Sequence, residues 1–140
     1  MSEENKALER REFEEVWNKH NPDAIDEIYA PDFVHHNAPP GMPNDREGHK
    51  ALVGMYLGAF PDLKVTSDFL VAEGDKVVNR WTGTGTHTGE LMGIPATGKR
   101  IKMTGIAIVR VADGKIAELW LESNQMGLMQ QLGVIPAPGG

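Results

Sequence analysis

The chain has 140 residues with a formal net charge of −6, 40% hydrophobic residues and no cysteine. This length fits one domain with a sizeable core, and the acidic balance disfavours a nucleic-acid binder, which needs a basic face. Disulfides and thiolate metal sites are excluded, no apolar run approaches the roughly 18 residues of a membrane span, and the charged N-terminus predicts a cytoplasmic protein without a secretory signal.

The first third of the chain has helical patterns interrupted by turn signals. Residues 3–20 predict a helix with an imperfect apolar stripe, and a short second helix is expected to start at Asn21-Pro22 and to end before Pro31. A brief extended segment follows at residues 33–36. Residues 37–45 hold three prolines and a glycine, which indicates a loop long enough to form the rim of a pocket.

After one more helix, the sequence pattern changes from helical to strand-like. Residues 44–47 have the spacing of a capping box, and a helix is expected from there to Phe60. Strands are predicted at residues 63–72, 76–87, 100–112 and 115–124, with tight hairpin turns at 73–76 and 112–115. The connection 88–99 carries three glycines and a proline and is predicted to be a second rim.

The stretch from residue 115 to 133 combines a strand with a closing helix. Alternation puts Glu118, Trp120, Glu122 and Asn124 on one face of the strand. A face that mixes a large aromatic with carboxylates and an amide is typical of a pocket wall. The spacing then becomes helical and stops at Gly133. The order of elements predicts an α+β fold, in which a curved antiparallel sheet wraps around N-terminal helices and encloses an apolar pocket.

Several motifs carry a family resemblance that runs from Trp17 to Gly133. They are PDLKV at residues 61–65, AEGDKVVNRWTGTGTHTGELMGIPATGKR at 72–100, and WLESNQMGLMQQLG at 120–133. In this order and spacing the chain resembles the SnoaL-like polyketide cyclases, ester-cyclase-type enzymes with the nuclear-transport-factor cone fold. The resemblance implies a single domain over residues 1–140, with 136–140 as a flexible tail, and an intramolecular aldol cyclisation that needs no metal or cofactor.

The resemblance also implies an aspartate acid/base at position 124, where this chain has Asn124. An amide cannot abstract a proton, so Asn124 is expected either to donate a hydrogen bond to the substrate or to cap the closing helix, or to do both. Glu122, on the same predicted face, is a candidate replacement base; the alternatives are that the strand edge is wet at this point, or that Glu122 pairs with Arg80 or Arg110 across the sheet. His36 corresponds to a histidine often found in the family and is a second acid/base candidate.

Aromatic residues and one histidine are candidates for substrate binding, with core packing as the alternative for each. The predicted set is Trp17, Tyr56, Phe60, Trp81, His87 and Trp120. His36 and its neighbour His35 should point in opposite directions, which disfavours a metal site.

Three functions fit this sequence. The first is a cofactor-independent cyclase, or a related lyase or isomerase, acting through an enolate on a small aromatic or lipophilic carbonyl substrate. The second is a binding protein of the same fold that has lost its aspartate. The third is an epoxide hydrolase-like enzyme, for which the sequence offers no Asp–Arg–Asp cluster. Cone-fold proteins of the kind this chain resembles usually pair through the convex sheet face, so the resemblance implies a homodimer or homotetramer, and apolar residues in the strands add some support. Neither nucleic acid nor membrane is expected as a partner.

Overall fold

The computed structural model describes residues 2–135, and the expected tail at 136–140 lies outside the described residues. The helical elements are α1 (Ser2–Glu12), the π-helical η1 (Phe13–Asn18), the 3-10 helix η2 (Pro22–Ala24), α2 (Ile25–Ile28), α3 (Arg46–Ala59) and α4 (Gln125–Leu132). The strands are β1 (Tyr29–His35), β2 (Lys64–Glu73), β3 (Lys76–Thr86), β4 (Arg100–Ala112) and β5 (Lys115–Ser123).

The five strands form one curved sheet in the order β1-β5-β4-β3-β2. Strands β2 to β5 are an antiparallel meander, and the four strands predicted for this part of the chain agree with it to within one or two residues. The sheet is not antiparallel throughout, because β1 pairs with β5 in parallel. This strand begins at Tyr29 rather than at residue 33, and Pro31 lies within it instead of ending a helix. An edge strand tolerates a proline because its outer side has no ladder partner.

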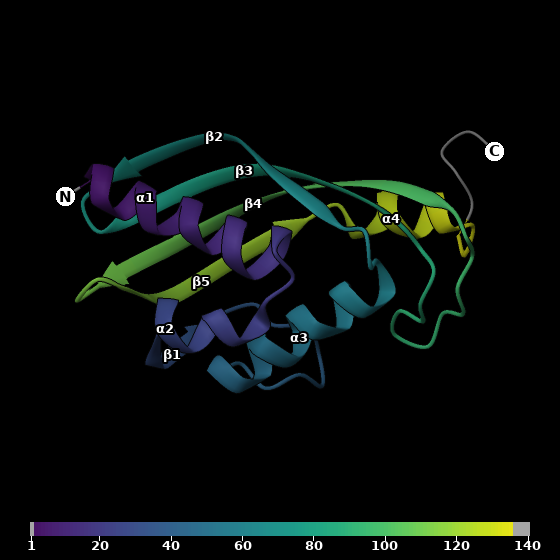
Figure 1. Ribbon diagram of the computed structural model, residues 1–140, viewed down its shortest axis with the longest axis horizontal. Coiled ribbons are helices and arrows are strands. Elements are labelled where there is room, and N and C mark those ends of the chain that lie inside the picture. The colour runs from purple at the N-terminus through teal and green to yellow at the C-terminus, as the bar shows by residue number, and fades with distance from the viewer. Residues whose placement is uncertain (1, 136–140) are drawn as a thin grey trace.

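The helices cover one face of this sheet (Figure 1). Helix α1 and η1 cross the inner face, and α3 lies further out on the same side. Asp45 caps α3 by accepting a hydrogen bond from the Gly48 amide at 2.8 Å. The short α4 packs against the start of β4, where its Gln131 exchanges two hydrogen bonds with the backbone of Lys102. The predicted fold class, an α+β cone with a closing helix, is confirmed.

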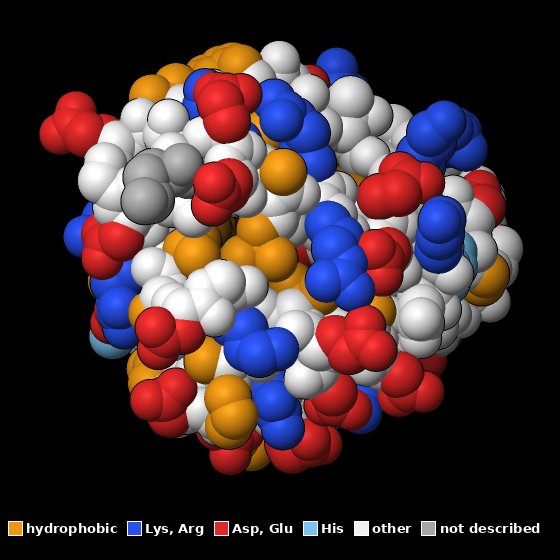
Figure 2. All heavy atoms as spheres, turned by 60° about the vertical axis from the view of Figure 1, so that its left-hand side comes forward, with side chains coloured by type: hydrophobic (Ala, Val, Ile, Leu, Met, Phe, Trp, Pro, Cys, Tyr) orange, Lys and Arg blue, Asp and Glu red, His pale blue; other side chains and the backbone are white. Residues whose placement is uncertain are grey.

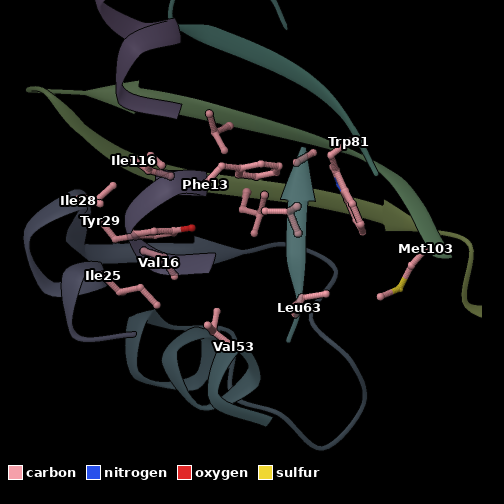
Figure 3. Close-up of a cluster of buried hydrophobic side chains, with 14 of the residues drawn as sticks. Phe13, Val16, Ile25, Ile28, Tyr29, Val53, Leu63, Trp81, Met103 and Ile116 are labelled. Atoms are coloured by element: carbon pink, nitrogen blue, oxygen red, sulfur yellow. The ribbon is translucent and has the colours of Figure 1, made fainter. Parts of the chain in front are cut away.

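The core lies between the inner face of the sheet and the helices (Figure 3). Phe13 and Val16 of η1 point into it with Ile28, Tyr29 and Val53 from the helices and β1, while Trp81 and Met103 reach in from the sheet. Along β3 every second residue from Val77 to Gly85 is buried, and β4 alternates in the same way. This period of two fixes which side chains of the sheet face the helices.

Candidate active site

A cavity of about 440 Å³ lies between the helices and the inner sheet face. Its walls come from every layer of the fold, and its rim includes both predicted loops, through Pro39 and Pro40 on one side and Met92 on the other. The lining residues are Glu9, Glu12, Phe13, Trp17, His35, Asn37, Pro39, Pro40, His49, Leu52, Tyr56, Leu63, Val65, Trp81, Gly83, Met92, Met103, Ala107, Val109, Leu119, Leu121, Glu122, Ser123 and Gln125. Most of them are apolar, which is typical of a small-molecule pocket.

Two carboxyl groups of α1 are buried in this apolar wall. Glu9 is 1% exposed and Glu12 is 4% exposed. Asn79 of β3 donates a hydrogen bond to Glu9 at 3.0 Å through Nδ2. No cation pairs with either carboxyl among the described ion pairs, and each retains one oxygen without a hydrogen-bond partner among residues 2–135. Fully buried acids without a cation are costly, so a pocket that contains two of them is a candidate for chemistry.

Two aromatic side chains hold Glu12 in place. Tyr29 donates to Oε1 of Glu12 at 2.5 Å, and the indole N–H of Trp17 donates to the same oxygen at 3.3 Å. Behind Tyr29, Nε2 of His49 lies 3.2 Å from the phenol oxygen. Trp17 reaches back five residues because Phe13–Asn18 is a π-helix, whose period brings residues i and i+5 to the same side. Oε2, the other oxygen of Glu12, is unpartnered.

Burial sets the protonation of this cluster. Desolvation raises the pKa of Glu12 from 4.5 to about 7, against the hydrogen bonds from Tyr29 and Trp17, which lower it. Desolvation and the nearby Glu12 charge raise the pKa of Glu9 well above its ordinary value. Burial lowers the pKa of His49 to about 3, so its imidazole is neutral. At neutral pH Glu12 is therefore poised to accept or to give a proton.

Three of the six predicted binding residues line the cavity and three do not. Trp17, Tyr56 and Trp81 are in its wall. Phe60 is fully buried in the core, 5.5 Å from the His87 ring. His87 is buried as well, and its Nδ1 lies 3.0 Å from the Thr97 hydroxyl, which ties down the 88–99 loop. The alternative of core packing is correct for these two residues.

The face of β5 that was predicted to form the pocket wall points away from the cavity, and the opposite face lines it. Leu119, Leu121 and Ser123 face the cavity, opposite Val109, Ala107 and Gly105 of β4. Trp120 therefore points outward, where it stacks on His36 with ring centroids 4.6 Å apart. The ordinary rule that the polar face of a strand is the wet one holds here.

The acid/base candidates predicted from sequence follow this outer face. His36 contacts Glu118 at 2.7 Å, and Arg110 also binds Glu118. Glu122 is exposed and accepts from Nδ2 of Asn37 at 3.1 Å; it borders the cavity only at the rim. The structure does not bring His36, Glu122 and Asn124 together around the pocket, so a catalytic role for them would require a substrate bound outside it.

Asn124 is the N-cap of α4. Its side-chain oxygen accepts from the Gly127 amide at 2.9 Å, and the residue is exposed. The close packing of the amide leaves no room for a Cβ at Gly127, where one would lie 2.5 Å from Nδ2. Of the two roles expected for Asn124, the geometry shows the cap.

Four ionisable pocket residues were not among the predicted site residues. Glu9 and Glu12 occupy the stripe that continues at Phe13, Val16 and Trp17, so two acids on an apolar helix face were the signal available in the sequence. His35 lines the pocket because alternation along β1 turns it inward when His36 turns outward. His49 gave no sequence signal, since it lies early in α3 among polar residues.

The rest of the described surface has weaker candidates for a functional site. A second hollow of about 760 Å³ lies between α1 and the two hairpin turns and is an open groove lined by Leu8, Arg11, Asp75 and Val111 among others. Figure 2 shows acidic and basic side chains interspersed over the face at this end. Among residues 2–135, no group of three metal-binding side chains occurs. None of the described helices is both long and apolar enough to cross a membrane.

Comparisons with known proteins agree with this architecture. The family model described as SnoaL-like polyketide cyclase matches residues 7–132. TsrD from Streptomyces laurentii superimposes with a TM-score of 0.87 at 32% identity, covering 96% of this chain and 98% of TsrD. AclR from Streptomyces galilaeus gives 0.85 at 34% identity, covering 98% of this chain and 85% of AclR.

A curated relative matches over a shorter stretch. The aklanonic acid methyl ester cyclase DnrD of Streptomyces peucetius is 40% identical over 57 residues, which are 40% of this chain and 39% of DnrD. The aligned part is thus about two fifths of each protein. The family model, in contrast, spans nearly the whole chain. The chain therefore belongs to the SnoaL-like polyketide cyclase family, and this membership supports a cyclase role.

Proposed function

We propose that this protein is a cofactor-independent cyclase that closes a ring by an intramolecular aldol reaction, with Glu12 as the acid/base. The observation that carries the proposal is the state of Glu12: it is buried in an apolar cavity, has one unpartnered oxygen and has a pKa of about 7. A carboxyl with these properties suits proton transfer at carbon at neutral pH.

The reaction has three steps that balance without an oxidant or a reductant. The Glu12 carboxylate removes a proton from the carbon next to a carbonyl group and leaves an enolate. The enolate carbon attacks a second carbonyl carbon of the same molecule, which forms the C–C bond and turns the attacked oxygen into an alkoxide. The alkoxide then takes the proton back from Glu12. Product and substrate are isomers, and the base is regenerated.

The fixed hydrogen bonds of Glu12 fit both halves of this cycle. Tyr29 and Trp17 donate to Oε1, so they orient the carboxyl and stabilise the ionised form that removes the proton. The opposing desolvation keeps the acid form accessible for the return step. Oε2, which has no partner within residues 2–135, is the atom that would meet the substrate.

The test is turnover by wild type and by Glu12→Gln. Aklanonic acid methyl ester is the first substrate to use, because DnrD is named as its cyclase. Product is followed by chromatography with mass detection, which should show an isomer of unchanged mass. We expect Glu12→Gln to lose roughly 10²- to 10⁴-fold in kcat, and Glu14→Gln, an exposed neighbour in η1, to keep wild-type rates. Equal rates for wild type and Glu12→Gln would refute the assigned base.

The second candidate is a binding protein without turnover. The observation in its favour is the amide at position 124, where the family motif has an aspartate, serving as a helix cap. Ligand binding without product from any substrate tested would support it. The hydrolase alternative has less support, since no arginine or aspartate is among the described residues lining the cavity.

We also propose that two copies pair through the outer sheet face. Three large apolar side chains are exposed there: Phe69 (57%), Val71 (53%) and Ile106 (45%). Phe69 and Ile106 flank Arg80 on adjacent strands, so they form one surface. Sedimentation velocity should show a dimer or tetramer that Ile106→Asp dissociates. A wild-type monomer at micromolar concentration would refute the pairing.

A further inference from the structure

The indole N–H of Trp81 is a buried hydrogen-bond donor in the wall of the cavity. Trp81 is 8% exposed, it lines the pocket, and its Nε1 has no hydrogen-bond partner among residues 2–135. Buried tryptophan N–H groups usually find an acceptor. The cost of leaving this one unpaired is recovered if a ligand supplies the acceptor.

One glycine shapes the place where this ring lies. Trp81 extends from the sheet toward the interior (Figure 3) and lines the cavity. A Cβ at Gly105, its cross-strand partner on β4, would lie 2.5 Å from Cζ2 and 2.7 Å from Cε2 of the indole. At Gly83 a Cβ would lie 3.5 Å from Cζ3, an ordinary van der Waals distance. The ring therefore rests closely against the bare backbone of Gly105 alone.

Helix α1 and strand β3 place Glu12 and Trp81 in the walls of the same cavity. Both run in the same direction, away from the end where α1 begins beside the Gly74–Asp75 turn (Figure 1). The hydrogen bond between Glu9 and Asn79 ties them together. From that bond Glu12 is about 4.5 Å further along the helix, and Trp81 is about 6.6 Å further along the strand. Glu12 and Trp81 therefore both lie beyond the Glu9–Asn79 bond, on the same side of it.

We infer that the Trp81 N–H binds the substrate oxygen that becomes negatively charged when Glu12 removes the neighbouring proton. The inference rests on the proposed function and extends it, because it names the group that stabilises the enolate. Trp17 and Tyr29 are less suited to this task, since their donors already bind Glu12. The ligand class that follows is a flat enolisable carbonyl compound or a phenol, whose oxygen lies within one or two bonds of the reacting atom.

The first test is binding of 2-naphthol, a phenol whose hydroxyl can donate to Glu12 and accept from Trp81. Protein labelled with ¹⁵N at the indoles gives three N–H signals, which Trp17→Phe, Trp81→Phe and Trp120→Phe assign. We expect 2-naphthol to move the Trp81 signal strongly downfield and to leave that of Trp120, on the outer face, in place. Naphthalene, which lacks the oxygen, should not cause the downfield shift.

The second test is kinetic and separates this inference from the proposed function. Trp81→Phe keeps an aromatic ring but removes the donor, so we expect kcat to fall roughly 10²- to 10³-fold with a smaller change in KM, and 2-naphthol to bind roughly tenfold more weakly. An unmoved Trp81 signal on 2-naphthol binding, or full activity of Trp81→Phe beside inactive Glu12→Gln, would overturn the donor role and leave the base assignment standing. Loss of binding in His35→Gln alone would do the same and would assign the donor to His35.

Discussion

Replacing Glu12 by glutamine should make stability less dependent on pH. Folding raises the pKa of this carboxyl from 4.5 to about 7, so the folded protein binds the proton more tightly than the unfolded chain. The free energy of unfolding contributed by this group is therefore highest below pH 4.5 and falls as pH rises through about 7. From those two pKa values the loss between pH 5 and pH 8 is roughly 2 to 3 kcal/mol.

Glutamine is a matched replacement. Its side-chain oxygen can still accept from Tyr29 and Trp17, and it carries no charge that burial disfavours. Removing the Glu12 charge also relieves Glu9, whose pKa that charge raises, and this effect has the same sign. Relative to wild type, Glu12→Gln should therefore gain roughly 2 to 3 kcal/mol of stability between pH 5 and pH 8.

Urea unfolding at a fixed protein concentration, followed by tryptophan fluorescence at pH 5, 6.5 and 8, measures this difference. Glu14→Gln is the control, because it removes the same charge from an exposed position of η1. Its stability relative to wild type should stay constant to within a few tenths of a kcal/mol. If the difference in free energy of unfolding between Glu12→Gln and wild type did not change with pH, the reasoning would be refuted. Such a result would mean that the Glu12 carboxylate is solvated in the folded protein.

Three further substitutions test neighbouring parts of the account. Tyr29→Phe removes a hydrogen bond that lowers the pKa of Glu12, so the acidic limb of the pH–rate profile should move to higher pH; an unchanged limb would contradict the contact. Asn124→Ala should lower the free energy of unfolding by about 1 kcal/mol, because it removes the helix cap. Asn124→Asp should keep both the cap and the wild-type rate. A gain in activity in Asn124→Asp would instead show that the family aspartate acts as the base. Gly105→Ala should cost roughly 1–3 kcal/mol in thermal unfolding, because its Cβ meets the Trp81 ring, and unchanged stability would mean that the ring moves freely.

The fold followed from the sequence because its signals are local. Alternation located β2 to β5, the turns at 73–76 and 112–115 set their pairing, and prolines and glycines marked both rims of the cavity. The strand β1 was harder, since its pairing with β5 is parallel and joins segments more than 80 residues apart. No local sequence pattern indicates such a strand pairing.

The site was harder to predict because the polar face of β5 also carries a large aromatic. Alternation separates Leu119 and Leu121 from Trp120 and its flanking carboxylates, but Trp120 favoured the outer face as the pocket wall. The buried acids were accessible in principle, as charged residues on the apolar stripe of the first helix. The π-helical turn that aims Trp17 at Glu12 was not, because nothing in FEEVWN distinguishes it from an α-helix.

The central claim is that a buried Glu12 titrates near neutral pH inside the cavity. The most direct measurement is a ¹³C NMR titration of side-chain carboxyl groups, with the Glu12 signal assigned by its absence in Glu12→Gln. We predict a midpoint at about pH 7. A midpoint close to 4.5, that of a solvated glutamate, would contradict the claim.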